Sequence, residues 1–515
     1  MNVRVWKTSV LQAEDHPEYM NSSKNNKDGK NRKNRIIVIG AGAAGLMAAA
    51  AAADAGADVL VLEKNEKAGK KIYITGKGRC NFTNACETSE FFGNVVSNPK
   101  FLYSAVYGFD QQQMIDFLEE NGCRTKIERG KRAFPLSDHA SDVTKALTDH
   151  LKRKSVRVRY NQTVKEILTE DNDQNNDENT LRAAGVLLDS GEKLSADAVI
   201  VCTGGISYSS TGSTGDGYRF AEDLGLKVAP AAPSLVPFTI KEQWPLELQG
   251  LALKNVSVKL MPVEAELPAD ESAAAGAAAQ AEQNGVQSNI AAQADRDGVQ
   301  SGSAAQGNVP AKKKSKKKKS KPVYEGFGEM LFTHFGISGP LILSASAYAD
   351  FLKYPAGFVL HLDLKPALSE QELVVRLEKE FSLAPFKEMA GALRPLFPGK
   401  LTDVVVQLLE EKCGIRPDRT ARTINEKEMA AMASLIKDIT MTVNGTRGFA
   451  EAVVTRGGVS VKEIDPSTME AKAVPGLYFA GEVIDVDALT GGFNLQIAWS
   501  TGHLAGQSAA ESNGD

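Results

Sequence analysis

The order of apolar and polar residues predicts alternating strands and helices over much of the chain. Residues 36–39 (IIVI) are uniformly apolar, which is typical of a strand buried on both faces of a parallel sheet. An alanine-rich helix is expected next, and a second apolar strand over residues 58–62. This alternation fades after residue 227 and returns near the end of the chain. We therefore expect one discontinuous α/β domain built from residues 35–227 and 441–509.

The intervening stretch has a different pattern and predicts inserted domains. Its first part contains PSLVPFTI and LKNVSVKLMPV, which indicate strands, so we expect a β-rich insert domain over residues 228–362. Residues 363–440 are expected to form a helical insert domain. Ser369 and Asn425 each precede a glutamate by three positions, which is the spacing of a helix capping box.

Two segments are too polar to supply a core. Residues 1–34 are rich in Asn, Lys and Asp, and residues 264–322 are mostly Ala, Gln, Gly and Ser followed by a run of lysines. Few large apolar side chains are present to offset the entropy cost of ordering, so we expect a disordered tail and a disordered insertion. The insertion is expected to interrupt a hairpin of the β-rich insert, because strand-like sequence resumes directly after it.

Composition and charge narrow the class of protein. The chain has 515 residues, 42% of them hydrophobic and 24% charged, and lacks an apolar run long enough to span a membrane. The net charge is −4 although residues 312–321 hold eight lysines, so the rest is acidic, which argues against a broadly basic nucleic-acid surface. Five scattered cysteines and a polar N-terminus without a secretory signal predict a cytoplasmic protein without a disulfide framework.

A glycine motif at the first predicted strand indicates dinucleotide binding. Gly40, Gly42 and Gly45 have the spacing G-x-G-x-x-G between a strand and a helix. Such glycines allow the tight turn, the close approach of a pyrophosphate, and close packing of the helix on the strand. Glu63 ends the second strand, where a carboxylate can accept hydrogen bonds from ribose hydroxyls. A Rossmann-like fold that binds FAD or NAD, rather than NADP, is the interpretation.

Two later segments favour FAD. Residues 197–205 (DAVIVCTGG) predict a strand whose glycine-rich end can approach a dinucleotide. Residues 477–506 predict a strand, a Gly491-Gly492 turn and a helix, whose N-terminal N–H groups would face the flavin edge that becomes negative on reduction. Asn494 and Gln496 are candidates for hydrogen bonds to the flavin ring, although one of them can instead cap the helix.

A polar glycine-rich loop follows the second strand. Residues 69–84 (GKKIYITGKGRCNFTN) suggest close approach of the backbone to a ligand, and Lys71 and Arg79 offer positive charge. The alternative is an ordinary surface loop. A second G-x-G-x-x-G motif is missing between residues 228 and 440, so a separate nicotinamide domain is not expected. NAD(P)H would then be a transient co-substrate.

Few residues stand out as candidates for proton transfer. His334 could act as a general acid near neutral pH, with a packed structural histidine as the alternative, and Arg79 is a second catalytic candidate. Cys80 and Cys86 are separated by five residues, which does not match a redox pair and favours free thiols. Neither a metal-ligand cluster nor a serine hydrolase motif is apparent.

Several of these motifs together resemble one family. GAGAAG, LEKN, GKKIYITGKGRCNFTN, GEMLFTHFGISGP, TRGGVSVKEIDPSTME and GLYFAGEVIDVDALTGGFNLQIAWSTGHLAG are similar to the bacterial HI0933-like flavoproteins, which include BaiN-like and aminoacetone-oxidase-like proteins. The resemblance implies a split Rossmann-like FAD domain with inserted domains, bound FAD and an NAD(P)/FAD-dependent oxidoreductase. The expected cofactor-binding residues are Gly40, Gly42, Ala43, Ala44, Gly45, Glu63, Lys64, Lys71, Gly78, Arg79, Cys80, Asn81, Val164, Thr203, Gly204, Gly205, Gly481, Glu482, Asp485, Gly491, Gly492, Phe493, Asn494, Leu495 and Gln496.

The sequence thus predicts an FAD-dependent oxidoreductase that transfers hydride at flavin N5 to or from a small organic substrate, with NAD(P)H as the electron donor. Three alternatives stay open: a flavoprotein that modifies RNA, an oxidase reduced by its own substrate, and a non-catalytic FAD or NAD sensor. The lysine run at 312–321 is the sequence feature that supports RNA, because lysines can hold phosphates; a solvated loop is its simpler interpretation.

Overall fold

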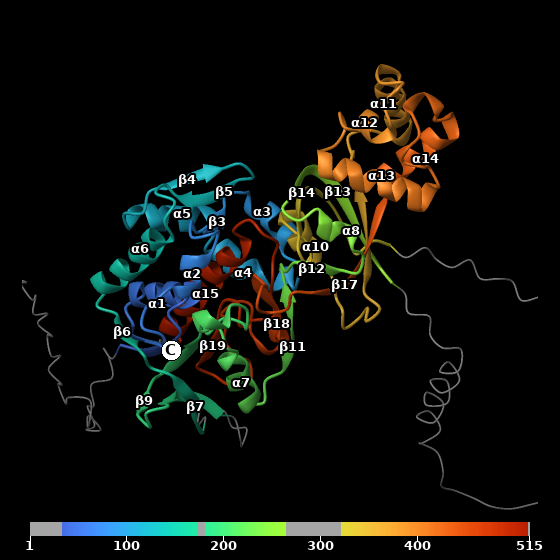
Figure 1. The fold of residues 1–515 in the computed structure, drawn as a ribbon. Coiled ribbons are helices and arrows are strands. Elements are labelled where there is room, and N and C mark those ends of the chain that lie inside the picture. The colour runs from blue at the N-terminus through green and yellow to red at the C-terminus, as the bar shows by residue number, and fades with distance from the viewer. Residues whose placement is uncertain (1–32, 172–180, 264–320, 513–515) are drawn as a thin grey trace, which may run out of the picture.

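The structure is a computed structural model that describes residues 33–171, 181–263 and 321–512 (Figure 1). The expected disordered tail (1–34) and insertion (264–322) therefore lie outside the described residues, apart from their last two positions in each case. The main α/β domain and the inserted domains are arranged side by side, with the helical insert at the far end (Figure 1).

A five-stranded parallel sheet forms the centre of the main domain, with the spatial order β19-β10-β1-β2-β6. The chain runs outward from β1 through β2 to β6 and then returns to the other side of β1 for β10 and β19. This order is that of a Rossmann fold, and its reversal between β1 and β10 creates the crevice where dinucleotides bind. The strands are β1 (Arg35–Ile39), β2 (Asp58–Glu63), β6 (Arg157–Tyr160), β10 (Ala198–Val201) and β19 (Leu477–Phe479).

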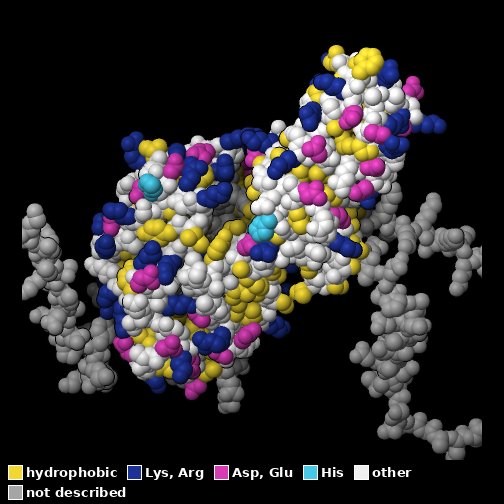
Figure 2. Space-filling model, viewed as in Figure 1, with side chains coloured by type: hydrophobic (Ala, Val, Ile, Leu, Met, Phe, Trp, Pro, Cys, Tyr) yellow, Lys and Arg dark blue, Asp and Glu magenta, His cyan; other side chains and the backbone are white. Residues whose placement is uncertain are grey.

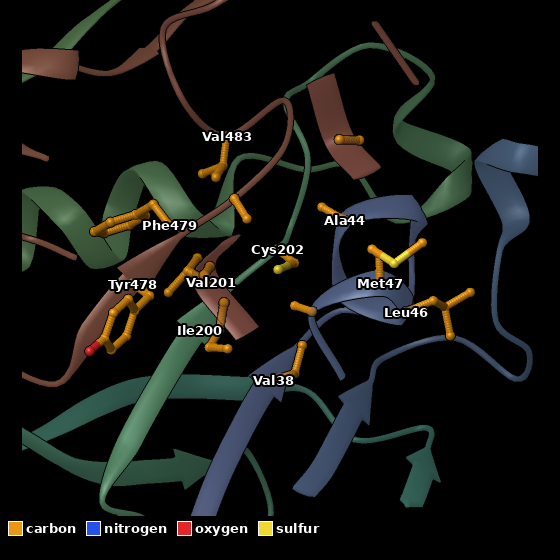
Figure 3. Packing of buried hydrophobic residues seen from close by; sticks show 14 of the residues in the cluster. Val38, Ala44, Leu46, Met47, Ile200, Val201, Cys202, Tyr478, Phe479 and Val483 are labelled. Carbon is orange, nitrogen blue, oxygen red and sulfur yellow. The ribbon is translucent and has the colours of Figure 1, made fainter. Parts of the chain in front are cut away.

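Two helices from opposite ends of the chain pack against each other beside this sheet. They are α1 (Ala43–Asp54) and α15 (Phe493–Glu511). Residues 44–52 of α1 are buried, which explains why the helix is apolar all round. A Cβ on Gly506 would lie 2.2 Å from the carbonyl oxygen of Ala48, so only glycine allows this close approach. Figure 3 shows the core formed by α1, the sheet and the residues after β19.

Smaller elements surround the sheet. A meander of β7 (Val164–Asp171), β8 (Leu181–Leu188) and β9 (Lys193–Ser195) leads into β10, and β3 (Thr83–Asn84), β5 (Arg132–Pro135) and β4 (Thr125–Glu128) form another sheet. The helices of this part are α2 (Lys70–Ile74), α3 (Thr88–Phe91), α4 (Tyr103–Gly108), α5 (Gln111–Glu120), α6 (Ala140–Arg153) and α7 (Asp216–Asp223), with short 3-10 turns η1 (Phe92–Asn94), η2 (Pro99–Leu102) and η3 (Ser209–Thr211).

The β-rich insert is a closed six-stranded barrel with the order β12-β15-β14-β13-β16-β17. Its strands are β12 (Phe238–Ile240), β13 (Ala252–Pro262), β14 (Tyr324–Thr333), β15 (Gly336–Ser338), β16 (Phe358–Asp363) and β17 (Ile439–Thr446), with helices α8 (Trp244–Glu247) and α10 (Pro340–Ser346). We expected the first domain to resume at residue 441. That boundary is wrong, because β17 pairs with β16 and β12 and closes the barrel.

The helical insert lies between β16 and β17. It contains α11 (Glu370–Leu383), α12 (Met389–Leu393), α13 (Gly399–Cys413), η4 (Ala421–Thr423) and α14 (Glu426–Lys437). Both predicted capping boxes are present: the side chains of Ser369 and Asn425 accept from the backbone N–H of Glu372 and Glu428, and each glutamate returns a bond. These caps satisfy N–H groups that the first helical turn leaves unpaired.

Two antiparallel strands, β11 (Val228–Ser234) and β18 (Val454–Val459), connect the main domain to the barrel, and η5 (Val461–Glu463) follows. Directly after β11, Leu235 packs with Val454 and with Ala347, which follows α10, in a small apolar cluster separate from the two large cores. The two ends of the insert therefore emerge together and hold the barrel against one side of the main domain.

Candidate functional site

A cavity of about 1060 Å³ opens where the strand order reverses. Its wall includes Gly40 after β1, Glu63 at the end of β2, Thr203 after β10 and Ala480 after β19. All four lie at the carboxyl edge of the parallel sheet, which is where ligands bind in open α/β folds. The volume is at the upper end of the range for ligand sites in proteins.

The glycine turn shapes one wall of the cavity. Gly40 has a φ of +101°, and a Cβ there would lie 2.6 Å from the carbonyl oxygen of Cys202. A Cβ on Gly45 would lie 1.9 Å from the carbonyl oxygen of Gly40, so Gly45 allows α1 to pack against the turn. Gly42 differs, because a Cβ there would meet no protein atom within 4 Å. Gly42 therefore faces open space in the cavity wall, as the approach of a phosphate requires.

Glu63 is held firmly beside this turn. Its carboxylate accepts hydrogen bonds from the backbone N–H of Ala41 at 2.7 Å and of Asn65 at 2.9 Å, and from the Asn65 side chain at 2.7 Å. The side chain is buried but lines the cavity. A carboxylate has about four acceptor positions, so these bonds fix its orientation and leave capacity for a ribose hydroxyl.

Two cavity residues have buried polar atoms without a partner among the described residues. They are Oδ1 of Asn81 and Oγ1 of Thr203. A buried polar atom without a hydrogen bond costs free energy, so such atoms at a cavity wall indicate a polar ligand. Together with the open space at Gly42, they fit a dinucleotide, which carries many hydroxyl, phosphate and ring groups.

The N-terminus of α15 forms a second wall. Gly491 to Leu495 line the cavity, and no side chain caps the helix, so its first N–H groups are available to a ligand. The Asn494 side chain accepts from the Ala488 N–H at 2.9 Å and donates to the Ala488 carbonyl at 2.7 Å. Asn494 thus fixes the turn before the helix. The positive end of the helix dipole favours a ligand that gains negative charge there.

A polar network lies across the cavity wall near α2. Lys71 Nζ donates to Ser207 Oγ and to Glu482 Oε2, at 2.6 Å each, and Glu482 Oε1 accepts from the Thr455 N–H at 2.8 Å. The side chains of Lys71 and Glu482 are 24% and 20% exposed. The network joins four segments that are far apart in the sequence and fixes both charged groups at the cavity.

Arg79 lines the cavity, but two acids bind its guanidinium. Nε donates to Asp138 at 2.8 Å, Nη2 also contacts Glu128, and the group lies 4.1 Å from the centre of the Phe134 ring. The bonds to Glu128 and Asp138 raise the pKa of Arg79, and the bond from Arg79 lowers the pKa of Glu128. The pKa of Asp138 is lowered first by its bond from Lys126 and then by the bond from Arg79. These contacts hold the Arg79 guanidinium in ion pairs at the cavity wall, and the catalytic role of Arg79 stays a prediction.

Most predicted cofactor-binding residues lie at the cavity. Those that line it are Gly40, Gly42, Ala43, Ala44, Glu63, Lys64, Lys71, Arg79, Asn81, Val164, Thr203, Gly204, Glu482, Gly491, Gly492, Phe493, Asn494 and Leu495. Lys64 is also tied to Asp216 of α7 by an ion pair of 2.7 Å. The polar and charged residues of this lining come from both sequence segments of the main domain, the one before the inserts and the one after them.

Other predicted residues are not among those that line the cavity, and their contacts with a cofactor stay predictions. They are Gly45, Gly78, Cys80, Gly205, Gly481, Asp485 and Gln496. Gln496 is fully buried, where it donates to the Phe109 carbonyl and to Ser500 Oγ. Cys80 is fully buried, and burial raises the pKa of its thiol. The glycines serve packing or the turn itself.

His334 does not line the cavity either. It lies exposed between β14 and β15, and its ring contacts Phe335. The structure therefore lends no support to His334 as an acid beside the cofactor, and that role stays a prediction.

Several cavity residues were missed from the sequence. Asn84 and Cys86 lie in or beside the glycine-rich motif, and Asn84 Nδ2 donates to the carbonyls of Gly130 and Gly491 at 3.1 Å. The motif itself was the available signal for Asn84. An apolar part of the wall comes from both domains and had no local signal, because its members meet only in the fold: Leu235, Pro340, Leu343, Val453, Val454 and Leu489.

The strand order, the glycine turn and the open helix N-termini define a dinucleotide-binding protein of the Rossmann class. The model of the family described as HI0933-like protein Rossmann domain matches residues 34–508. The chain belongs to this family, and it is an FAD-dependent oxidoreductase.

Curated relatives cover nearly the whole chain. A ribosomal RNA dihydrouridine synthase of Escherichia coli (strain K12) is 30% identical, over 92% of this chain and 96% of that protein. A 3-dehydro-bile acid delta(4,6)-reductase of Clostridium scindens is also 30% identical, over 93% of this chain and 99% of that protein. A solved 3-ketosteroid delta1-dehydrogenase of Sterolibacterium denitrificans aligns with a TM-score of 0.42 and 14% identity, covering 93% of this chain and 100% of that one.

The described residues contain neither a candidate membrane-spanning helix nor a candidate metal-binding cluster. Over residues 33–171, 181–263 and 321–512, no helix combines the length and apolar character needed to cross a membrane. In the same ranges, no three His, Cys, Asp or Glu side chains are grouped so that they could hold a metal ion.

Proposed function

We propose that this enzyme reduces a carbon–carbon double bond conjugated to a carbonyl group, with FAD as the bound cofactor and NAD(P)H as the electron donor. The cavity carries this proposal. It joins the dinucleotide crevice to an apolar region between the main domain and the barrel, walled by Leu235, Leu343 and Leu489 among others. A flat organic ring can enter such a region and lie beside the cofactor.

The names of two relatives support the same reaction. Forming dihydrouridine saturates the ring bond of uracil that is conjugated with a carbonyl, and the name delta(4,6)-reductase of a 3-dehydro-bile acid implies double bonds conjugated with the 3-oxo group. The substrates differ greatly in size and charge, whereas the bond is of one type. We therefore propose the type of reaction and leave the particular substrate to experiment.

The chain's residues would bind, orient and shield the reactants. Bound FAD supplies two-electron hydride chemistry. Asn81 and Thr203 would hydrogen-bond the cofactor, and the N–H groups at the start of α15 would stabilise negative charge on it. The apolar wall excludes water from the substrate region, which strengthens these interactions.

Anaerobic stopped-flow reduction tests the proposal. The purified protein should contain FAD, NADH or NADPH should bleach its absorbance, and an α,β-unsaturated ketone or uridine in RNA should restore it. A colourless protein that takes up no FAD on reconstitution would contradict the cofactor. Flavin that neither nicotinamide reduces, but that an organic substrate reduces under anaerobic conditions, would favour an oxidase instead.

Uracil in RNA is a second candidate substrate, and one observation favours it over a neutral molecule. Lys77, Lys131 and Arg132 line the cavity and are exposed, and of these only Lys131 forms an ion pair in the described part of the chain, with Glu90. Figure 2 shows Lys and Arg side chains along the edge of the hollow between the main domain and the inserts. Reaction of reduced enzyme with an RNA transcript, followed by mass spectrometry of its nucleosides, tests for dihydrouridine.

A further inference from the structure

An exposed aromatic cluster lies on the surface of the main domain. Phe92 of η1 contacts two tyrosines of α4: its ring centre is 4.5 Å from that of Tyr103 and 5.7 Å from that of Tyr107. The two tyrosine rings are 6.4 Å apart. Tyr103 is 46% exposed and Tyr107 is 62% exposed. Burial of these rings against each other is incomplete, so their free faces are open to a ligand.

The cluster is next to the cavity. Glu90 and Asn94, two residues on either side of Phe92, both line the cavity. Phe91 is fully buried and packs edge-on against Phe493, the first residue of α15, with ring centres 5.6 Å apart. The same short segment therefore presents polar groups to the cavity and an aromatic ring to the surface.

Exposed cations lie at the edge of the cavity and beside α4. Lys77, Lys131 and Arg132 form the basic edge of the cavity already described, and Lys100 is the second residue of η2, which leads into α4. Lys77, Lys100 and Arg132 are exposed and form no ion pair with another described residue. Cations without an ion-pair partner, together with exposed aromatic rings, are complementary to a nucleic-acid strand, which carries both phosphates and flat bases.

We propose that Phe92, Tyr103 and Tyr107 form a stacking platform for unpaired bases of an RNA strand that delivers a uracil to the cavity. The inference rests on the second candidate substrate of the proposed function. A base inside a duplex cannot reach an enclosed site, so the strand must be single-stranded or the base flipped out. Aromatic side chains that stack the neighbouring bases would hold such a strand without reading its sequence.

Fluorescence anisotropy with a labelled, uridine-rich, single-stranded oligoribonucleotide tests the platform. The double variant Tyr103→Ala/Tyr107→Ala should bind at least about tenfold more weakly than the wild type. Tyr103→Phe/Tyr107→Phe should bind like the wild type, because stacking needs the ring and not the hydroxyl. Phe386→Ala, which removes a 75% exposed ring in the helical insert, is the matched control and should have no effect.

Flavin content and the rate of flavin reduction by NADH or NADPH should be the same in all these variants, which separates the platform from the redox site. The wild type could bind RNA, and the alanine variant could bind it more weakly as expected, while no dihydrouridine forms. This result would support the platform and remove RNA as the substrate. Unchanged affinity in the alanine variant would overturn the platform and direct attention to a protein partner. An equal loss in the phenylalanine variant, or no RNA binding by the wild type, would also overturn it.

Salt dependence gives an independent check on the basic edge. Arg132→Ala should lower the steepness of the salt dependence of RNA affinity by about one charge. An unchanged slope would overturn the part of the proposal that assigns phosphates to this edge. Deleting residues 312–321 in a separate variant measures what the lysine run adds.

Discussion

Gly42 and Gly45 of the glycine turn should respond differently when each is changed to alanine: the first variant should lose affinity for FAD, and the second should lose stability. Gly42 has φ −82° and ψ −166°, which any residue can adopt, and a Cβ there meets no protein atom within 4 Å. Gly42→Ala should therefore leave the apoprotein nearly as stable, with a loss of about 0.5–1 kcal/mol because alanine is a poor N-cap. The added methyl group stands in the cavity, where the pyrophosphate is expected.

The cost to FAD binding follows from that overlap. If crowding costs here what it costs in a packed core, about 1–3 kcal/mol, the Kd for FAD rises about five- to 150-fold. Gly45→Ala is the matched variant. Its Cβ would lie 1.9 Å from the Gly40 carbonyl oxygen, whereas Cβ contacts in proteins are essentially never shorter than 3.0 Å, so α1 must shift by at least about 1 Å. This variant should lose about 1–3 kcal/mol of apoprotein stability.

Urea unfolding of the apoproteins and titration with FAD, followed by flavin fluorescence, measure the two effects separately. The expected result is weak FAD binding by a stable Gly42→Ala protein and a lower urea midpoint for Gly45→Ala. Wild-type FAD affinity in Gly42→Ala would refute the placement of the pyrophosphate at this turn. A larger stability loss in Gly42→Ala than in Gly45→Ala would refute the packing argument itself.

Three more perturbations have definite expected outcomes. Gly506→Ala in α15 should cost about 1–3 kcal/mol of stability in urea unfolding, because its Cβ would lie 2.2 Å from the Ala48 carbonyl oxygen, whereas Gly399→Ala, with no atom within 4 Å, should be nearly neutral. Lys71→Met and Glu482→Gln should each weaken the cavity network, and a double-mutant cycle should give a coupling of about 0.5–3 kcal/mol; additive effects would contradict the network. Burial raises the pKa of the Asp487 carboxyl, so the native state keeps its proton above the pH at which the unfolded chain loses it. Stability should thus fall as pH rises above about 4, the ordinary range for an aspartate, and Asp487→Asn, compared by thermal unfolding, should lose less stability over the same rise; parallel curves would contradict a raised pKa.

Local sequence determined the elements that bind a dinucleotide. The run Ile36–Ile39 must be a buried strand, the glycine spacing requires a tight turn, and Glu63 follows the next strand at a fixed distance along the chain. These relationships span about 30 residues in one βαβ unit, so short-range patterns suffice to predict them. The same holds for the capping boxes at Ser369 and Asn425, which depend on residues three positions apart.

Side-chain direction and long-range pairing could not be predicted in this way. Gln496 lies one residue after the cavity-lining Leu495, yet the rotation of the helix directs it into the core toward Phe109. Arg79 is in the predicted loop, but Glu128 and Asp138 reach it only through the fold. The imidazole of His334 suits proton transfer, but the barrel hairpin exposes it to solvent.

The boundary of the barrel shows the same limit. The apolar and polar residues of β17 alternate in a way that fits either domain, and only its pairing with β12 and β16 assigns it to the barrel. The apolar wall of the cavity depends on two domains that meet across the ends of β11 and β18. The sequence alone therefore determined the fold of the dinucleotide crevice, because its signals are local. Only the tertiary structure decided which side chains face the cavity, because burial and partners arise from contacts between segments hundreds of residues apart.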